Sequence, residues 1–280
     1  MTRENGGGLR LKICCIQMDV CAGAPEKNFS RALVLLKKAA KKKPDVILLP
    51  ELWNTGFAPL KIDPKLADEN GERTKLFCGG FAREYGVNLV AGSVLTSKYW
   101  SVYNTAYVFD RTGDCIAEYD KTHLFSPSGE DIPYTAGIRV VTFPLDGIPF
   151  GVMICYDLRF AELSRALALS GAKALLIPAE WPRERTEQML ALLRARAIEN
   201  QQFAVLCNGC GEAFGTRFGG KSAIYDPLGK ALALAGLGEQ MIFAEIDFAM
   251  QEKIREELPA FSDRRPFLYG SLCEPVKKNH

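Results

Sequence analysis

The sequence predicts a mixed α/β sandwich and not a purely parallel, doubly wound sheet. Segments with the period of amphipathic helices alternate along the chain with short apolar runs that are typical of strands. Several of these runs are joined by tight turns, such as the one at Asp146 and Gly147. Short turns connect antiparallel strands and parallel strands need long crossovers, so we expect sheets that contain both kinds of pairing.

Five helices are expected between the strands. In the first of them Phe29, Leu33, Leu36 and Ala40 share one face, which is the spacing of a helix that packs on a sheet. The expected helices cover residues 26–43, a stretch that ends near 86, a stretch that starts near 161, 186–200 and 250–258.

Strands are expected where apolar and β-branched residues dominate. They cover residues 11–18, 46–50, 88–94, 103–110, 115–121, 140–143, 150–155, 174–181, 203–208 and 241–248. Turn residues 111–114 join two of them into a hairpin, and Asp226, Pro227 and Gly229 mark a further hairpin.

The composition is that of an ordinary soluble globular protein, with 280 residues of which 48% are hydrophobic and 24% charged. We expect a flexible N-terminus over residues 1–10, a single domain over residues 11–270 and a C-terminal tail over residues 271–280. The segment from Pro259 onward is polar and contains prolines, so it is either disordered or an arm laid on a neighbouring subunit.

Charge and cysteine content narrow the expected partners and compartment. The net charge is only +2, whereas proteins that bind nucleic acid or an acidic membrane usually carry a large excess of basic residues. The first residues have no apolar leader, and no apolar run reaches the ~18 residues that span a bilayer. Nine scattered cysteines fit reduced thiols better than a disulfide framework. We therefore expect a cytoplasmic protein whose partner is a small molecule or another copy of itself.

Only two histidines are present, His123 and the final residue His280. A mechanism with a histidine base would have to rest on His123 alone, and a zinc site of several histidines is excluded. A carboxylate is therefore the expected general base.

Cys155 follows an apolar strand and precedes a helix. A thiol on such a turn can face a cleft, where nearby backbone N–H groups can point at a developing oxyanion. A buried structural cysteine is the commoner outcome in this setting and stays open as the alternative.

Glu51 and Lys121 also follow strands, the first directly after VILLP and the second after a strand that ends in EYD. Many α/β folds carry their functional residues at strand ends, although a lone charged residue there is more often solvated surface. The chemistry links these residues to Cys155. A thiol needs a base to become a thiolate, and a tetrahedral intermediate needs a cation or donors at its oxygen.

Three segments resemble, in this order, the signature blocks of the nitrilase-like carbon-nitrogen hydrolase superfamily. They are PELWNTGF around Glu51, DKTHLF around Lys121 and CYDLRF around Cys155. The resemblance continues through YTAG, AEW and RARAIENQ and covers residues 11–269. Three motifs in order are far more specific than any one of them. CYDLRF followed by AEL is similar to the omega-amidase group.

The resemblance implies a four-layer αββα sandwich that dimerises to αββα-αββα through helices and C-terminal segments. It implies that Glu51, Lys121 and Cys155 are catalytic and that no metal or organic cofactor is needed. A second glutamate, which helps to position substrate and lysine in many members, falls on Glu130 in the loop SPSGEDIPYTAG.

The family's chemistry implies amide hydrolysis in two stages. Glu51 takes the proton of Cys155, the thiolate attacks the amide carbonyl, and Lys121 with the backbone N–H of Tyr156 holds the oxyanion. Ammonia leaves, and Glu51 then activates a water that hydrolyses the thioester.

The omega-amidase likeness favours amides of 2-oxo acids, such as 2-oxoglutaramate. True nitrilases tend to carry Trp-Glu after the cysteine, whereas Tyr156 and Asp157 stand here, which favours amide over nitrile hydrolysis. Deaminated glutathione or an N-carbamoyl compound stays open as the substrate. A catalytically silent binding protein on the same fold also stays open.

Four residues near the strand ends are expected to bind substrate: Tyr156, Arg159, Glu180 and Trp181. Arg159 can pair with a substrate carboxylate, but a salt bridge to Asp157 or Glu162 is an equal alternative. Simple packing is the alternative for Trp181. The CNGC segment that ends at Cys210 lacks the two further ligands of a structural zinc site, so no metal is expected there.

Overall fold

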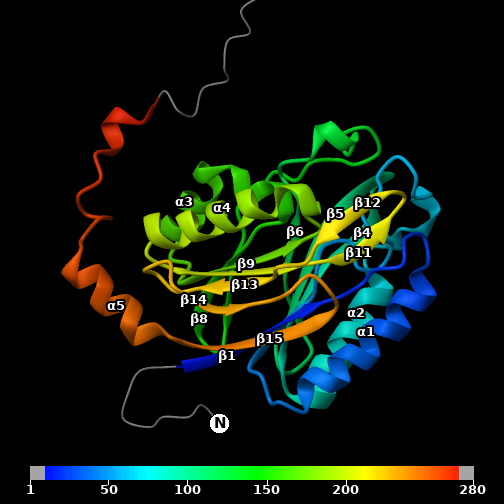
Figure 1. The fold of residues 1–280 in the computed structure, drawn as a ribbon, viewed down its shortest axis with the longest axis horizontal. Helices are drawn as coiled ribbons and strands as arrows, with labels where there is room; N and C mark the ends of the chain where they lie inside the picture. Colours follow the sequence, from blue (N-terminus) through cyan, green and yellow to red (C-terminus); the bar gives the residue numbers. More distant parts are fainter. Residues whose placement is uncertain (1–9, 271–280) are drawn as a thin grey trace, which may run out of the picture.

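Two main β-sheets face each other in the computed structural model, which describes residues 10–270 (Figure 1). The strand order of the first sheet is β15 (Gln240–Asp247), β1 (Arg10–Gln17), β2 (Val46–Leu48), β4 (Asn88–Lys98), β5 (Ser101–Phe109) and β6 (Cys115–Asp120), and β3 (Asp68–Glu69) pairs with β4. The strand order of the second sheet is β14 (Ala231–Leu234), β13 (Ala223–Tyr225), β10 (Phe203–Asn208), β9 (Ala174–Ala179), β8 (Ile148–Val152) and β7 (Thr142–Leu145). A separate hairpin consists of β11 (Cys210–Ala213) and β12 (Thr216–Gly219).

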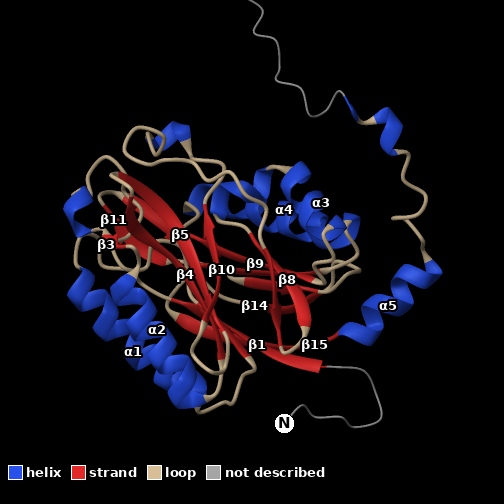
Figure 2. Ribbon diagram, turned by 180° about the vertical axis from the view of Figure 1, so that it is seen from behind, coloured by secondary structure: helices blue, strands red, loops and turns tan. Residues whose placement is uncertain are grey.

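Helices cover the outer face of each sheet. The first sheet carries α1 (Pro25–Ala40) and α2 (Glu72–Tyr85), and the second carries α3 (Ala161–Leu169) and α4 (Thr186–Glu199). Figures 1 and 2 show the two helix pairs on opposite sides of the paired sheets, with α5 (Phe248–Glu257) at the periphery after β15. This arrangement confirms the expected four-layer αββα sandwich.

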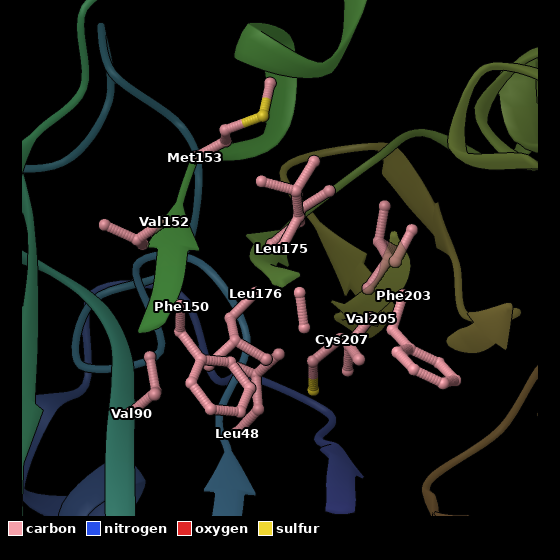
Figure 3. Close-up of a cluster of buried hydrophobic side chains, with 14 of the residues drawn as sticks. Leu48, Val90, Phe150, Val152, Met153, Leu175, Leu176, Phe203, Val205 and Cys207 are labelled. Carbon is pink, nitrogen blue, oxygen red and sulfur yellow. The ribbon is translucent and has the colours of Figure 1, made fainter. Parts of the chain in front are cut away.

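Two apolar clusters hold the layers together. The larger one fills the space between the sheets, where Leu48 and Val90 of the first sheet face Phe150 and Leu176 of the second (Figure 3). Ile47, the neighbour of Leu48 in β2, belongs to the cluster beneath α1 and α2. Successive strand residues point to opposite faces, so β2 contributes to both interfaces. Each buried aliphatic side chain contributes about 1.5–3 kcal/mol to the stability of this packing.

The strands that lead into the site point to the same end of the sandwich. In the first sheet β2 and β4 are parallel, and β6 runs in the same direction because both β4 and β6 are antiparallel to β5. In the second sheet β8 and β9 are parallel. The chain continues from these strand ends to Glu51 after β2, Lys121 after β6, Cys155 after β8 and Glu180 after β9.

A β-bulge in β4 fixes the chain on both sides of Glu51. The register of β4 against β5 shifts between Val90 and Ser93, and Gly92 inside this bulge has φ +58°. A Cβ at Gly92 would lie only 2.0 Å from the carbonyl oxygen of Pro50, so no other residue fits this close approach. Ser93 donates its N–H to that carbonyl at 3.1 Å, and its hydroxyl accepts the N–H of Leu52 at 3.0 Å.

The expected helices and strands are present, with boundaries that differ by a few residues. The first helix ends at Ala40 and not at Lys43, which has a left-handed backbone. The strand expected to reach Cys155 stops at Val152. The hairpin of β11 and β12 is not predicted by the sequence, because its glycines and polar residues have low β-propensity.

The terminal segments lie partly outside the described residues. Of the expected N-terminal segment 1–10 only Arg10 is described, and it already belongs to β1, where it pairs with Asp247 at 2.8 Å. The expected tail 271–280 lies wholly outside. Residues 259–270 are irregular except for the 3-10 helix Pro266–Leu268, and the ring of Phe261 lies beside Arg165 and Arg255. No helix within residues 10–270 is both long and apolar enough to cross a bilayer.

Candidate active site

Cys155 lies on a strained turn directly after β8. It begins the 3-10 helix Cys155–Arg159 and has φ +46°, a left-handed conformation that costs free energy for a residue with a side chain. The Asp157 carboxylate accepts the N–H of Ile154 at 2.8 Å and so holds the turn closed. Cys155 lines a pocket and, at 8% exposed, also packs against the apolar cluster between the sheets.

Asp157 also binds the segment that carries Lys121. Its carboxylate accepts hydrogen bonds from the Tyr119 hydroxyl at 2.7 Å and from the backbone N–H of His123 at 2.9 Å. The carboxylate oxygen that binds this N–H also lies 2.7 Å from Nδ1 of the His123 ring. These residues precede and follow Lys121. One buried carboxylate therefore fixes the lysine segment against the turn that bears Cys155.

Lys121 is fully buried between two carboxylates. Its Nζ lies 2.8 Å from Oε1 of Glu51 and 3.0 and 2.8 Å from the two carboxylate oxygens of Glu130. The Asn104 amide donates to both glutamates, at 2.9 Å to Glu51 and at 3.1 Å to Glu130. The Phe125 N–H donates to the remaining Glu130 oxygen at 2.6 Å. The expectation that Glu130 reaches Lys121 thus agrees with the observed contacts.

The second oxygen of Glu51 faces the strand end of β9 and the thiol. It accepts the backbone N–H of Glu180 at 2.8 Å, and the charge of the carboxylate acts on the nearby Cys155 thiol. Burial raises the pKa of Cys155 well above its ordinary value, the negative charge of Glu51 raises it further, and Lys121 opposes both. The resting state is therefore a neutral thiol beside a carboxylate that can take its proton.

Opposing effects set the charge of the buried lysine. Burial alone would lower the pKa of Lys121, but the charges of Glu130 and Glu51 raise it well above its ordinary value. Burial raises the pKa of Glu130, and Lys121 offsets this only in part. Lys121 is consequently an ammonium group throughout the physiological pH range.

The pocket next to the thiol has apolar walls and two guanidinium groups. Its lining residues are Phe57, Phe125, Cys155, Tyr156, Arg159, Glu180, Trp181, Pro182 and Arg185. All four residues expected to bind substrate are among them. Aromatic walls with a few polar groups are typical of small-molecule sites.

Arg159 forms neither of the local salt bridges considered from the sequence. It donates to the side chain of Gln188 at 2.9 Å, and its guanidinium lies 5.0 Å from the centre of the Trp181 ring. Arg185 lies over the ring of Phe125 at 5.4 Å. Among the ion pairs of residues 10–270, neither arginine has a carboxylate partner, so both charges are available to a ligand.

Sequence reasoning missed three residues of this region, namely Asn104, Asp157 and Arg185. Asn104 is the amide in the strand sequence YNTAYVF, and a carboxamide inside a buried strand is a signal that could have been used. For Asp157 the sequence suggests a salt bridge to Arg159 and a distinction from true nitrilases, but not its contacts with the Lys121 segment. His123, the one histidine available to a histidine mechanism, instead binds Asp157 and stacks on Phe160 at 3.6 Å between ring centres.

No cluster of three or more metal-ligating side chains is present within residues 10–270. In the CNGC segment, Cys207 donates to the carbonyl of Ile16 at 3.1 Å in the core between the sheets.

Fold and site together define a hydrolase that can use a thiol, a carboxylate and an ammonium group. A sequence model of the carbon-nitrogen hydrolase family matches residues 12–256, almost the whole described chain. The protein therefore belongs to the carbon-nitrogen hydrolase family, as the three motifs predicted.

Relatives of established name agree with this assignment. The chain is 41% identical over 261 residues to a 2-oxoglutaramate amidase of Bacillus subtilis, an alignment that covers 93% of this chain and 100% of the relative. It is 30% identical to the omega-amidase NIT3 of Saccharomyces cerevisiae, with 94% of this chain and 96% of the relative covered. The crystal structure of Saccharomyces cerevisiae Nit3, a member of branch 10 of the nitrilase superfamily, superposes with a TM-score of 0.84 at 28% identity and covers 91% of this chain and 97% of that one.

Proposed function

We propose that the protein is a cysteine-dependent omega-amidase that hydrolyses the terminal amide of a small 2-oxo acid and releases ammonia. The observation that carries the chemistry is the buried cluster in which Lys121 contacts both Glu51 and Glu130 beside the Cys155 thiol. The position of each group fits the role that we assign to it.

In the first stage Glu51 takes the thiol proton while the sulfur attacks the amide carbon. A C–S bond forms and the carbonyl π electrons move onto oxygen, next to the Lys121 ammonium. Tyr156 follows Cys155 at the start of a 3-10 helix, where the first N–H groups lack intrahelical acceptors, so its N–H is the second donor to the oxyanion. The tetrahedral species then collapses, the C–N bond breaks, and the nitrogen leaves as ammonia with the proton from Glu51.

In the second stage a water hydrolyses the thioester. Glu51 takes a proton from this water, the hydroxide oxygen bonds to the acyl carbon, and the C–S bond breaks. The sulfur recovers the proton from Glu51, and the carboxylic acid leaves. Glu130 and Asn104 keep Glu51 and Lys121 in place through both stages.

The pocket supports an anionic substrate. Arg159 and Arg185 add two positive charges to a lining in which the one acidic side chain, Glu180, is buried. A guanidinium binds carboxylates in a bidentate manner, and the aromatic rings under both arginines restrict their motion. The relatives named for 2-oxoglutaramate amidase activity support the same substrate class.

A panel of substrates tests this proposal. We expect ammonia release from 2-oxoglutaramate at a higher kcat/KM than from deaminated glutathione, N-carbamoyl amino acids or simple nitriles. Faster turnover of deaminated glutathione would keep the mechanism and overturn the substrate, and release of carbon dioxide would identify a carbamoyl compound. Absence of turnover on every member would favour a silent binding protein.

We further propose a homodimer in a reducing compartment such as the cytoplasm. The C-terminal segment leaves large apolar side chains exposed, among them Leu258 at 62% and Phe267 at 73%, which supports a partner surface there. All eight cysteines in the described part of the chain are free thiols, which fits a compartment that keeps thiols reduced. Light scattering of the purified protein tests the dimer.

A further inference from the structure

Glu180 is a buried carboxyl group for which the two-stage mechanism has no use. Its side chain is 1% exposed, and one oxygen, Oε2, accepts the backbone N–H of Phe57 at 2.7 Å. The other oxygen, Oε1, is buried and has no hydrogen-bond partner among the described residues. None of the ion pairs within residues 10–270 includes Glu180. A buried, ionised carboxylate without a cation would be very costly.

The titratable groups that face Glu180 do not supply a cation. The titratable groups near enough to interact with Glu180 are Glu51 after β2, Asp19 after β1, Tyr134, Cys155 and Cys210. The cations nearby already have partners. Lys121 lies between Glu51 and Glu130, and Arg31 lies between Asp19 and Glu239. Burial raises the pKa of Glu180 well above its ordinary value, and the charge of Glu51 raises it further.

Glu180 connects two parts of the site by its main chain and its side chain. Its backbone N–H donates to Glu51 at 2.8 Å, and its carboxyl group accepts the N–H of Phe57, a pocket wall. Glu51 and Phe57 are the two ends of the loop that follows β2. Residue 180 therefore holds the loop at both ends, through its main chain at Glu51 and through its side chain at Phe57.

We propose that Glu180 is a positioning residue that works as a neutral carboxylic acid, fixing the loop between Glu51 and Phe57 without adding a charge. This rests on the proposed function only in so far as Glu51 is the base. An ionised Glu180 would place a second negative charge beside Glu51 and beside the thiolate. It would also repel a substrate that carries a carboxylate.

Difference infrared spectroscopy tests the proton directly. We expect the spectrum of the wild type minus that of Glu180→Gln to contain the C=O band of a protonated carboxyl group at neutral pH. The same substitution at the exposed Glu69 is the control and should not give this band. A carboxylate signal from Glu180 at neutral pH would overturn the proposal, whether or not the protein turns over any amide.

The pH dependence of stability gives a second readout that needs no substrate. An unfolded glutamate loses its proton near pH ~4.3, but native Glu180 keeps it, so the unfolded state is favoured as the pH rises above that value. The stabilising effect of the raised pKa is thus complete below the unfolded pKa and is lost as the pH rises toward the native one. Relative to Glu180→Gln, the unfolding constant of the wild type should grow by up to about tenfold per pH unit in this window. A ratio that does not change with pH would contradict the neutral acid.

The kcat of two Glu180 variants tests whether an uncharged side chain at this position is sufficient. Glutamine reproduces the acceptor for Phe57 and adds no charge, so Glu180→Gln should keep at least tenfold more kcat than Glu180→Leu, which leaves that N–H unpartnered. Equal losses in both variants would mean that an uncharged acceptor for the Phe57 N–H does not sustain turnover, and the proposal would be wrong.

Discussion

The Tyr119 hydroxyl donates a 2.7 Å hydrogen bond to the Asp157 carboxylate and so joins the two sheets behind the thiol. Tyr119 belongs to β6 of the first sheet and stands two residues before Lys121, while Asp157 stands two residues after Cys155 at the end of the second sheet. The relative position of ammonium and thiol is therefore fixed by contacts outside the pocket.

Asp157→Asn should damage both stability and turnover. The amide nitrogen cannot accept the N–H groups of Ile154 or His123, and hydrogen bonds to a buried charge are worth more than neutral ones. We expect the free energy of unfolding in urea to fall by about 3 kcal/mol and kcat to fall more than KM rises. Asp263→Asn at an exposed position is the control. Unchanged stability would show that Asp157 does not clamp the turn.

Glu51→Gln should abolish turnover and yet make the thiol easier to ionise. After burial, the charge of Glu51 is the largest cause that raises the pKa of Cys155, so its removal lowers that pKa while Lys121 remains. Alkylation of Cys155 by iodoacetamide, followed by peptide mass spectrometry, should therefore reach half of its maximal rate at a lower pH than in the wild type. A shift to higher pH would contradict this account of the site.

Asn104→Ala should lower kcat by about 10–100-fold with little change in KM. The substitution removes two hydrogen bonds to buried carboxylates, each worth about 1.5–3 kcal/mol, and Asn104 does not line the pocket. Ser101→Ala on the same strand should have no such effect. Steady-state kinetics on 2-oxoglutaramate measures both variants, and a change confined to KM would place Asn104 in the binding site instead.

Arg159→Gln and Arg185→Gln should each raise KM for an anionic amide by about tenfold, since each removes a charged donor to the substrate carboxylate. A neutral amide of similar size should be affected much less. Arg183→Gln is the matched control, because Arg183 is exposed on the same 3-10 helix as Arg185 and does not line the pocket. Equal effects on neutral and anionic amides would argue against a carboxylate clamp.

The residues at strand ends could be predicted because the motifs and the apolar runs both point to them. Glu51, Lys121, Cys155 and Glu130 lie together as the resemblance implied, and the sandwich follows from the alternation of helices and strands. The roles of these residues stay a prediction until variants are measured.

Contacts between residues that are far apart in the chain could not be predicted from the sequence. Asn104 meets Glu51 across 53 positions, and Tyr119 meets Asp157 across 38, so neither spacing carries a local signal. For Arg159, the acidic residues close to it in the sequence suggest ion pairs that do not form. Its contacts are Trp181 and Gln188, which lie further along the chain. The apolar run up to Cys155 resembled one strand, but the left-handed backbone of Cys155 requires a turn.

The most direct test of the account is to trap the acyl-enzyme. The wild type is mixed with 2-oxoglutaramate, quenched in acid within the first turnovers, and analysed by intact-protein and peptide mass spectrometry. We predict an acyl adduct on the peptide that contains Cys155, and neither adduct nor ammonia release from Cys155→Ala. Turnover that persists in Cys155→Ala, or an adduct on another residue, would contradict the central claim that this thiol is the nucleophile.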